Sequence, residues 1–126
     1  MVNDESWWSR LAMLSKVAFV LLFLLVSYLA LTPQPVDLSS GNDKSDHLLA
    51  FFSLTLLLRH GWPNLSPWRS VLGVMLGYGI AIELLQRLVP GRDSSLLDIV
   101  ADLAGILLAL GASRWWLAPR ERASVE

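Results

Sequence analysis

Eight side chains that could do chemistry fall in three short stretches of an otherwise apolar sequence. In chain order they are Asp43, Lys44, His47, Glu83, Gln86, Arg92, Asp98 and Asp102. Carboxylates and an imidazole can exchange protons, whereas Lys and Arg pair with phosphates and carboxylates. Spacings of three and four residues recur in each stretch and place the side chains on one helix face. The pattern predicts three polar helix faces that together line a pocket.

Acid–base chemistry would use His47, Glu83 or Asp98, with Arg92 orienting a phosphate or carboxylate of the substrate. No Ser or Cys nucleophile motif accompanies these residues. A metal centre would combine His47 with Asp43, Glu83 or Asp98, but a single histidine without a compact ligand motif argues against one. We therefore expect no metal and no cofactor, and we favour a non-catalytic role.

Composition indicates the elements that must position these residues. The chain of 126 residues is 54% hydrophobic with a mean hydropathy of +0.50, which is typical of a membrane protein. Apolar stretches predict helices over about 11–31, 46–62, 70–89 and 96–117, and hence one all-α domain, 1–126, that forms a four-helix transmembrane bundle. The second stretch has a strictly apolar part of only 12 residues, so whether it spans fully stays open. A cleaved signal peptide over the first stretch is disfavoured, because no small-residue cleavage site follows its long apolar core.

Basic residues divide unequally between the two predicted faces. If all four helices span, seven Lys and Arg residues fall on the side of the termini and three on the other side. The positive-inside rule then predicts that both termini are cytoplasmic and that the candidate pocket faces outward. All six tryptophans fall on the predicted inner side, where they are typical interface anchors. There is no basic stripe for nucleic acid, and without cysteine there are no disulfides or thiolate ligands.

The polar residues of neighbouring helices are predicted to lie at similar depths in the membrane. Glu83 precedes the outer end of its helix by six residues, or roughly 9 Å at 1.5 Å per residue, and Asp102 lies about as deep in the next helix. Each ionisable group at mid-helix costs on the order of 2.5 to 3.5 kcal/mol, so the group as a whole indicates function. Taken singly, Asp43, Asp46 and Asp98 could cap helices, while Glu83 and Arg92 could form a structural pair.

Small residues indicate close helix packing. Gly73 and Gly77 form a GxxxG step, and Ala101, Gly105 and Ala109 recur every four residues. These faces could meet within one chain or pair two chains as a homodimer through Gly73 and Gly77. We favour the intramolecular alternative for so small a bundle.

The motifs resemble those of the VanZ-like family over about residues 43 to 111. They are Asp43-Lys44-x-x-His47-x-x-x-Phe51, Glu83-x-x-Gln86, and Pro90-Gly91-Arg92 followed by Asp98 and Gly105. Asp102 departs from the Asn that members commonly carry there. The resemblance implies a four-helix membrane protein of the bacterial envelope, in a family named for a role in resistance to the glycopeptide teicoplanin. It implies no agreed reaction.

Three functions therefore remain. The first is binding or modulation of a lipid-linked envelope component, such as a cell-wall precursor, or of an amphiphilic glycopeptide-type drug, by a protein of the bacterial cytoplasmic membrane. The second is a membrane-embedded enzyme that acts on a lipid-linked envelope substrate. The third, proton-coupled transport, is the least favoured, because four helices are few and no inverted repeat is evident.

Single introduced cysteines test the predicted topology, because the chain has none of its own. In intact cells an impermeant thiol reagent is expected to label Ser39→Cys, on the outer side, and to spare Ser66→Cys. Both positions should react once the membrane is permeabilised. The reverse pattern in intact cells would overturn the orientation.

Overall fold

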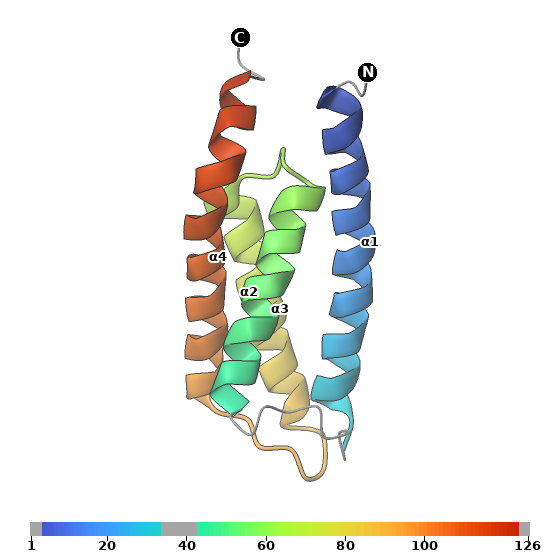
Figure 1. Ribbon diagram of the computed structural model, residues 1–126. Helices are drawn as coiled ribbons and strands as arrows, with labels where there is room; N and C mark the ends of the chain where they lie inside the picture. The colour runs from blue at the N-terminus through green and yellow to red at the C-terminus, as the bar shows by residue number, and fades with distance from the viewer. Residues whose placement is uncertain (1–3, 34–42, 124–126) are drawn as a thin grey trace.

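The chain folds as a bundle of α-helices (Figure 1). The computed structural model describes residues 4–33 and 43–123, with side chains described for 6–33 and 44–115. The helices are α1 (Asp4–Leu31), α2 (Asp43–Gly61), α3 (Leu72–Gln86) and α4 (Leu96–Ala123), and a π-helical turn, η1 (Pro67–Val71), leads into α3. Over the described ranges there is no strand, so the predicted all-α class with four helices is confirmed.

Consecutive helices run in opposite directions, so alternate connections lie at opposite ends of the bundle. Figure 1 places both termini at one end, together with the α2–α3 connection. The α3–α4 connection lies at the other end, where α2 and α4 begin. This arrangement collects the start of α2, the end of α3 and the start of α4 in one region, and these are the stretches that carry the candidate polar residues.

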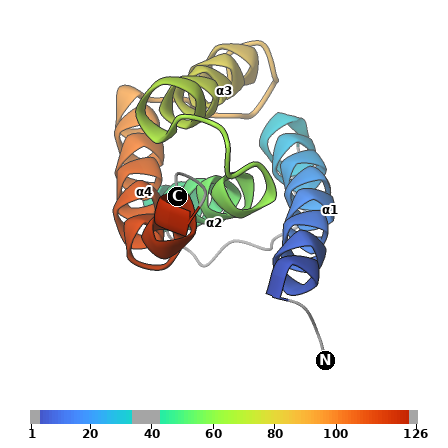
Figure 2. The ribbon, with the colours of Figure 1, turned by 90° about the horizontal axis from the view of Figure 1, so that it is seen from above.

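Three helices are long and apolar enough to cross a membrane: Ser6–Leu31, Pro67–Gln86 and Leu96–Trp115. The helix α2 does not meet this criterion because charged and polar residues occupy both of its ends. Viewed down the bundle, α2 lies at the centre (Figure 2), and it packs most extensively against α4 and α1. A helix packed between other helices needs fewer lipid-compatible residues. Whether α2 spans the membrane stays a prediction.

The helix bounds differ from the predicted ranges at several ends. The helix α1 begins at Asp4 and α4 continues to Ala123, beyond the apolar runs that define the predictions. Conversely, α3 ends at Gln86, before residues 87–89. Hydropathy marks only the lipid-compatible part of a helix, whereas its backbone hydrogen bonds continue through polar residues. The early end of α3 precedes the turn at Pro90, which cannot continue the helix.

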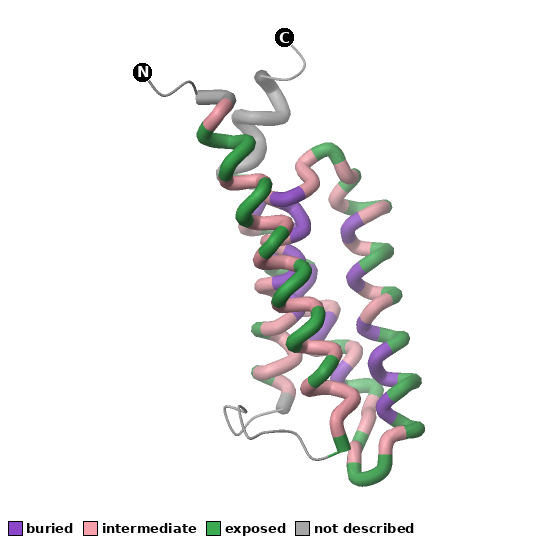
Figure 3. Tube along the Cα trace, turned by 90° about the vertical axis from the view of Figure 1, so that its right-hand side faces the viewer, coloured by how far each residue is buried: buried purple, intermediate pink, exposed green. Residues whose placement is uncertain are grey.

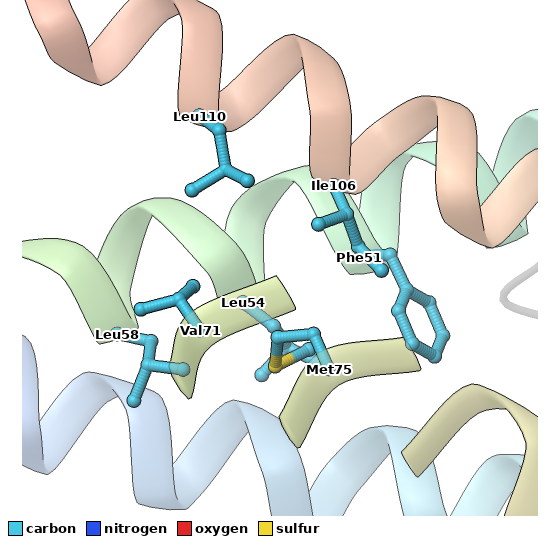
Figure 4. Packing of buried hydrophobic residues seen from close by; sticks show 7 residues of the cluster. All are labelled: Phe51, Leu54, Leu58, Val71, Met75, Ile106 and Leu110. Atoms are coloured by element: carbon cyan, nitrogen blue, oxygen red, sulfur yellow. The ribbon is translucent and has the colours of Figure 1, made fainter. Parts of the chain in front are cut away.

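The apolar core lies in the half of the bundle beyond His47. It comprises residues from α2, from η1 and α3, and from α4, which Figure 4 shows facing one another: Phe51, Leu54, Leu58, Val71, Met75, Ile106 and Leu110. Their spacing on α2, at i, i+3 and i+7, is that of one helix face. The core therefore fixes α2 against α3 and α4 immediately below the polar residues.

The helix α1 lies at the edge of the bundle. None of its described residues is buried, as the long unburied tube in Figure 3 shows, and several of its large apolar side chains point outward. Its inner side packs through aromatic rings, with Phe19 against Trp62 and Phe23 against Tyr78 at 4.7 Å between centroids. The Ser27 and Tyr78 hydroxyls also lie 2.6 Å apart. The outward face is suited to lipid, whereas the aromatic face attaches α1 to the other helices.

Glycine determines how closely α4 approaches α2. A Cβ at Gly105 would lie 2.4 Å from the Leu48 carbonyl oxygen and 3.0 Å from the Phe52 nitrogen, both on α2. Within the described part of the chain, a Cβ at Gly73 or Gly77 would meet nothing within 4 Å. The favoured intramolecular interpretation is therefore wrong for that GxxxG pair, which faces outward. Pairing of two chains through it stays a prediction.

We expect Gly105→Ala to destabilise the bundle by about 1–3 kcal/mol, because the added methyl group overlaps the α2 backbone. Gly111→Ala, on the same helix, is the matched control, and it should be neutral or slightly stabilising because a Cβ there would meet nothing within 4 Å and alanine favours helix. Reversible unfolding of the purified variants in detergent measures the difference. Equal effects of the two substitutions would contradict the close crossing.

Candidate functional site

The polar side chains of three helices meet at the end of the bundle opposite the termini. His47 comes from the start of α2, Glu83 from the last turn of α3, and Asp102 from the start of α4. One ligand-type atom of each of these three side chains lies within 4.8 Å of the other two. Three of the eight candidate residues, one from each helix, therefore lie together.

His47 and Asp102 form the contact that joins α2 to α4. The His47 Nδ1 atom lies 2.8 Å from Asp102 Oδ1, and the Asp102 side chain is completely buried. Gly105, one turn further along α4, permits this approach, since a side chain there would overlap α2. Gly79 does the same on α3, where a Cβ would lie 2.9 Å from Asp102 Oδ2. Gly79 thus leaves room for the buried carboxylate, and Gly105 leaves room for the α2 backbone.

Glu83 completes the central group without forming a hydrogen bond of its own. Its side chain is only 3% exposed, and neither carboxylate oxygen has a hydrogen-bond partner in the described part of the chain. A buried carboxylate normally has several partners, because an uncompensated charge is costly away from water. Glu83 is therefore the side chain in this group with the most unused capacity to bind a proton, a cation or a ligand.

Lys44 and Asp98 form an ion pair beside the central group. The Lys44 ammonium donates to Asp98 Oδ1 and also to Ser95 Oγ at 3.2 Å. Asp98 Oδ2 in turn accepts the Ser95 backbone N–H at 3.2 Å, which is the reciprocal half of a capping box at the start of α4. Asp98 is 2% exposed, whereas the Lys44 side chain is 43% exposed. The ion pair therefore extends from the interior to the surface.

Gln86 and Arg92 contact the end of α1. Gln86 Nε2 and Arg92 Nε both donate to the Ala30 carbonyl, at 3.0 and 3.1 Å, and a second Arg92 nitrogen donates to the Leu29 carbonyl at 2.6 Å. These bonds satisfy carbonyls that the last turn of a helix leaves open, and a cation there also suits the helix dipole. In this structure the two residues hold α1 to the bundle; a further role in ligand binding stays a prediction.

The Pro90-Gly91 turn aims Arg92 at α1. The Arg92 backbone N–H donates to the Val89 carbonyl at 3.3 Å, and Gly91 has a φ of +78°. This is the pattern of a type II turn, with proline first and a left-handed residue second, where glycine is favoured. The PGR motif thus has a geometric role: it ends α3 and directs the guanidinium back toward Leu29 and Ala30.

The other polar residues considered from the sequence differ in how far they are buried. The side chain of Asp43 lies outside the described residues, Asp46 is half-buried, and Arg87 is exposed. The Glu83–Arg92 pair considered from the sequence does not appear among the described ion pairs, because Arg92 turns to α1 instead.

Sequence reasoning missed a second buried polar site near the other end of the bundle. Arg59 on α2 is 2% exposed, and its guanidinium donates to Ser113 Oγ at 3.3 Å and to the Leu65 carbonyl at 3.5 Å. It lines a small cleft with Pro67, Trp68, Leu110 and Arg114. A lone arginine in the last turn of an apolar helix was the available signal. The bonds indicate that Arg59 connects α2 to α4 and to the following loop.

Charge balance distinguishes the two parts of the outer site. The Lys44 ammonium compensates Asp98, whereas Glu83 and Asp102 share a single imidazole, which carries at most one positive charge. With both carboxylates ionised, the central group is therefore negative whether the imidazole is neutral or protonated. Such a group favours protons, cations and hydrogen-bond donors over anions.

The fold and this site define a membrane-protein helical bundle with a buried acidic and imidazole cluster near one end. Residues 46–117, more than half of the chain, match the family described as VanZ/LLP1. The chain belongs to this family, which confirms the resemblance found in the motifs. The match covers α2 from Asp46 onward, all of α3, and α4 up to Leu117, and it does not include α1. No curated protein and no solved structure matches the chain.

A double-mutant cycle on Lys44 and Asp98 tests the ion pair. Lys44→Met should destabilise the protein by about 1–3 kcal/mol, below the roughly 3–5 kcal/mol of fully buried pairs because half of the lysine is solvated. Adding Asp98→Asn should recover part of this loss, with a coupling energy of about 0.5–3 kcal/mol. Unfolding in detergent measures the cycle. Arg87→Met, at an exposed cation nearby, is the control, and strict additivity of Lys44→Met and Asp98→Asn would contradict a direct interaction.

Proposed function

We propose that this chain is a bacterial cytoplasmic-membrane protein that binds the polar headgroup of a lipid-linked envelope component, such as a cell-wall precursor. In this proposal all four helices span, both termini are cytoplasmic, and the polar cluster faces outward. The division of basic residues, seven against three, supports this orientation. The observation that carries the binding function is the buried Glu83 carboxylate, which lies beside His47 and Asp102 and has no hydrogen-bond partner among the described residues.

Burial of these ionisable side chains makes a purely structural role costly in desolvation free energy. Glu83 and Asp102 are almost fully enclosed, yet Glu83 makes no hydrogen bond with described residues that would offset its desolvation. A structural carboxylate would be expected to cap a helix or pair with a cation, as Asp98 does. Glu83 does neither. Its carboxylate is therefore suited to a ligand that supplies hydrogen-bond donors or positive charge.

The chemistry of the site favours a headgroup with hydroxyl or amino groups. Carboxylates only accept hydrogen bonds, so Glu83 and Asp102 suit the donors of a sugar or peptide. Lys44, half exposed at the surface end of its ion pair, is placed to contact a phosphate that links the headgroup to its lipid. The same donors occur on a glycopeptide-type drug, which is the second ligand class that the family name suggests.

The direct test compares two soluble, short-chain probes: a lipid-linked sugar–peptide precursor and the same prenyl pyrophosphate without the headgroup. Wild-type protein in nanodiscs should bind the first probe at least about 10-fold more tightly, since hydrogen bonds to charged groups contribute about 1.5–3 kcal/mol. Glu83→Gln should reduce this difference, whereas Asp93→Asn, at an exposed acid near the same end, should preserve it. Teicoplanin, as a third probe, tests the drug directly.

Equal binding of the two precursor probes by wild-type protein, or the same affinity in wild type and Glu83→Gln, would contradict the proposed headgroup site. Size-exclusion profiles and helical circular dichroism establish that each variant is folded.

One observation favours a second candidate, a membrane-embedded enzyme. A carboxylate that holds one nitrogen of an imidazole orients the ring and stabilises its protonated form, and Asp102 lies 2.8 Å from His47 Nδ1 in this way. His47 would then act as the general base or acid, with Glu83 close to the reacting group. In that case His47→Gln would abolish turnover of the precursor while leaving its binding within a few fold of wild type.

A further inference from the structure

We infer that His47, Glu83 and Asp102 form a binding site for one divalent transition-metal ion of the Zn²⁺ or Mn²⁺ class. The three side chains come from three different helices, and one ligand-type atom of each lies within 4.8 Å of the other two. This inference does not require the proposed headgroup function, since a resident ion could also hold the helices together.

The donor set is appropriate to such an ion. Imidazole nitrogen suits zinc and similar metals, and carboxylate oxygen suits manganese and magnesium as well. Metal–ligand distances of about 2.0–2.2 Å place two donors on one tetrahedral ion roughly 3.3 Å apart. A separation of up to 4.8 Å therefore requires a modest inward movement of a side chain. Glu83 can make that movement without breaking a hydrogen bond, because its oxygens have no partner among described residues.

Burial supplies the second, independent argument. Glu83 is 3% exposed and Asp102 completely buried, and the nearby Lys44 ammonium is engaged with Asp98 and Ser95. Two ionised carboxylates with one neutral imidazole carry two negative charges, which a divalent ion would balance. Three protein ligands would also leave at least one coordination position for water or a ligand oxygen.

The neighbouring helices are shaped around this group. Gly79 on α3 leaves room for the Asp102 carboxylate, and Gly105 on α4 leaves room for the approach of the α2 backbone. At Gly79 an added Cβ would lie 2.9 Å from Asp102 Oδ2 and 3.3 Å from Phe51. Gly79→Ala would therefore displace one of the three donors while leaving every donor type in place, which makes it a geometric test of the site.

The experiment uses the full chain, purified in detergent, treated with chelator and titrated with Zn²⁺ and, separately, with Mn²⁺. Wild-type protein should bind one equivalent of Zn²⁺ or Mn²⁺, and its melting temperature should rise when that ion is bound. Glu83→Gln and His47→Gln should each weaken binding by more than about 100-fold, because removing a direct ligand exceeds the roughly 10- to 100-fold effect of outer partners. Gly79→Ala should weaken it to a smaller extent.

Asp93→Asn is the control for adventitious binding, because Asp93 is an exposed acid near the same end of the bundle. It should bind the ion as wild type does. Co²⁺ provides a second readout, since its visible absorption depends on the ligands and should change in His47→Gln. Glu83→Gln keeps the shape of the side chain and removes only its charge, so it is the variant expected to remain folded.

Two results would overturn the inference. The first is the absence of stoichiometric Zn²⁺ or Mn²⁺ binding by wild type, or equal binding by wild type and Glu83→Gln. The second is a metal-independent melting temperature in wild type together with a higher one in Glu83→Gln, which would show that a proton on Glu83 balances the cluster. Neither result depends on binding of a lipid-linked precursor.

Discussion

The close crossing of α2 and α4 at Gly105 is the constraint on which the rest of the structure depends. The α2 backbone lies so near that a Cβ at Gly105 would overlap the Leu48 carbonyl. One turn away, this proximity brings His47 within 2.8 Å of Asp102. On the other side it brings Phe51 and Leu54 into the apolar core with Ile106. A single helix contact thus positions the buried ionisable group and encloses it.

Polar residues at this end of the bundle serve two distinct purposes. Asp98, Gln86 and Arg92 satisfy helix ends, at the first turn of α4 or at the last carbonyls of α1, and Lys44 pairs with the Asp98 side chain. Glu83 satisfies no described backbone group and lies in the interior with His47 and Asp102. The membrane environment makes this distinction informative, because a buried charge without compensation is costly in lipid as well as in protein. The helix ends account for most of the polar motifs, and the central group is what remains for function.

Much of this arrangement was predictable from periodicity and hydropathy. Four helices, their antiparallel order and the convergence of His47, Glu83 and Asp102 follow from spacing and depth, because helical geometry is regular enough to extrapolate. The hydrogen-bond and ion-pair partners of the individual side chains were not predictable in the same way. Arg92 was expected to orient a phosphate or carboxylate in the pocket, whereas in the structure it bonds to Leu29 and Ala30, since the Pro90-Gly91 turn directs it to α1. Asp98 was a candidate for chemistry, but Ser95 and Lys44 engage both of its oxygens.

The sequence by itself determined the class of the protein, its helices, its family and the set of polar residues near one end. These properties depend on local composition and on spacing along the chain. Only the tertiary structure decided which glycines make close contacts, with Gly79 and Gly105 packed and Gly73 and Gly77 facing outward. It also decided that Arg59 is buried and that Glu83, rather than Asp98, is the carboxylate without a described partner. The reason is that sequence spacing shows which residues share a helix face but not how each helix is rotated about its axis. Packing between helices fixes that rotation and decides what each face contacts.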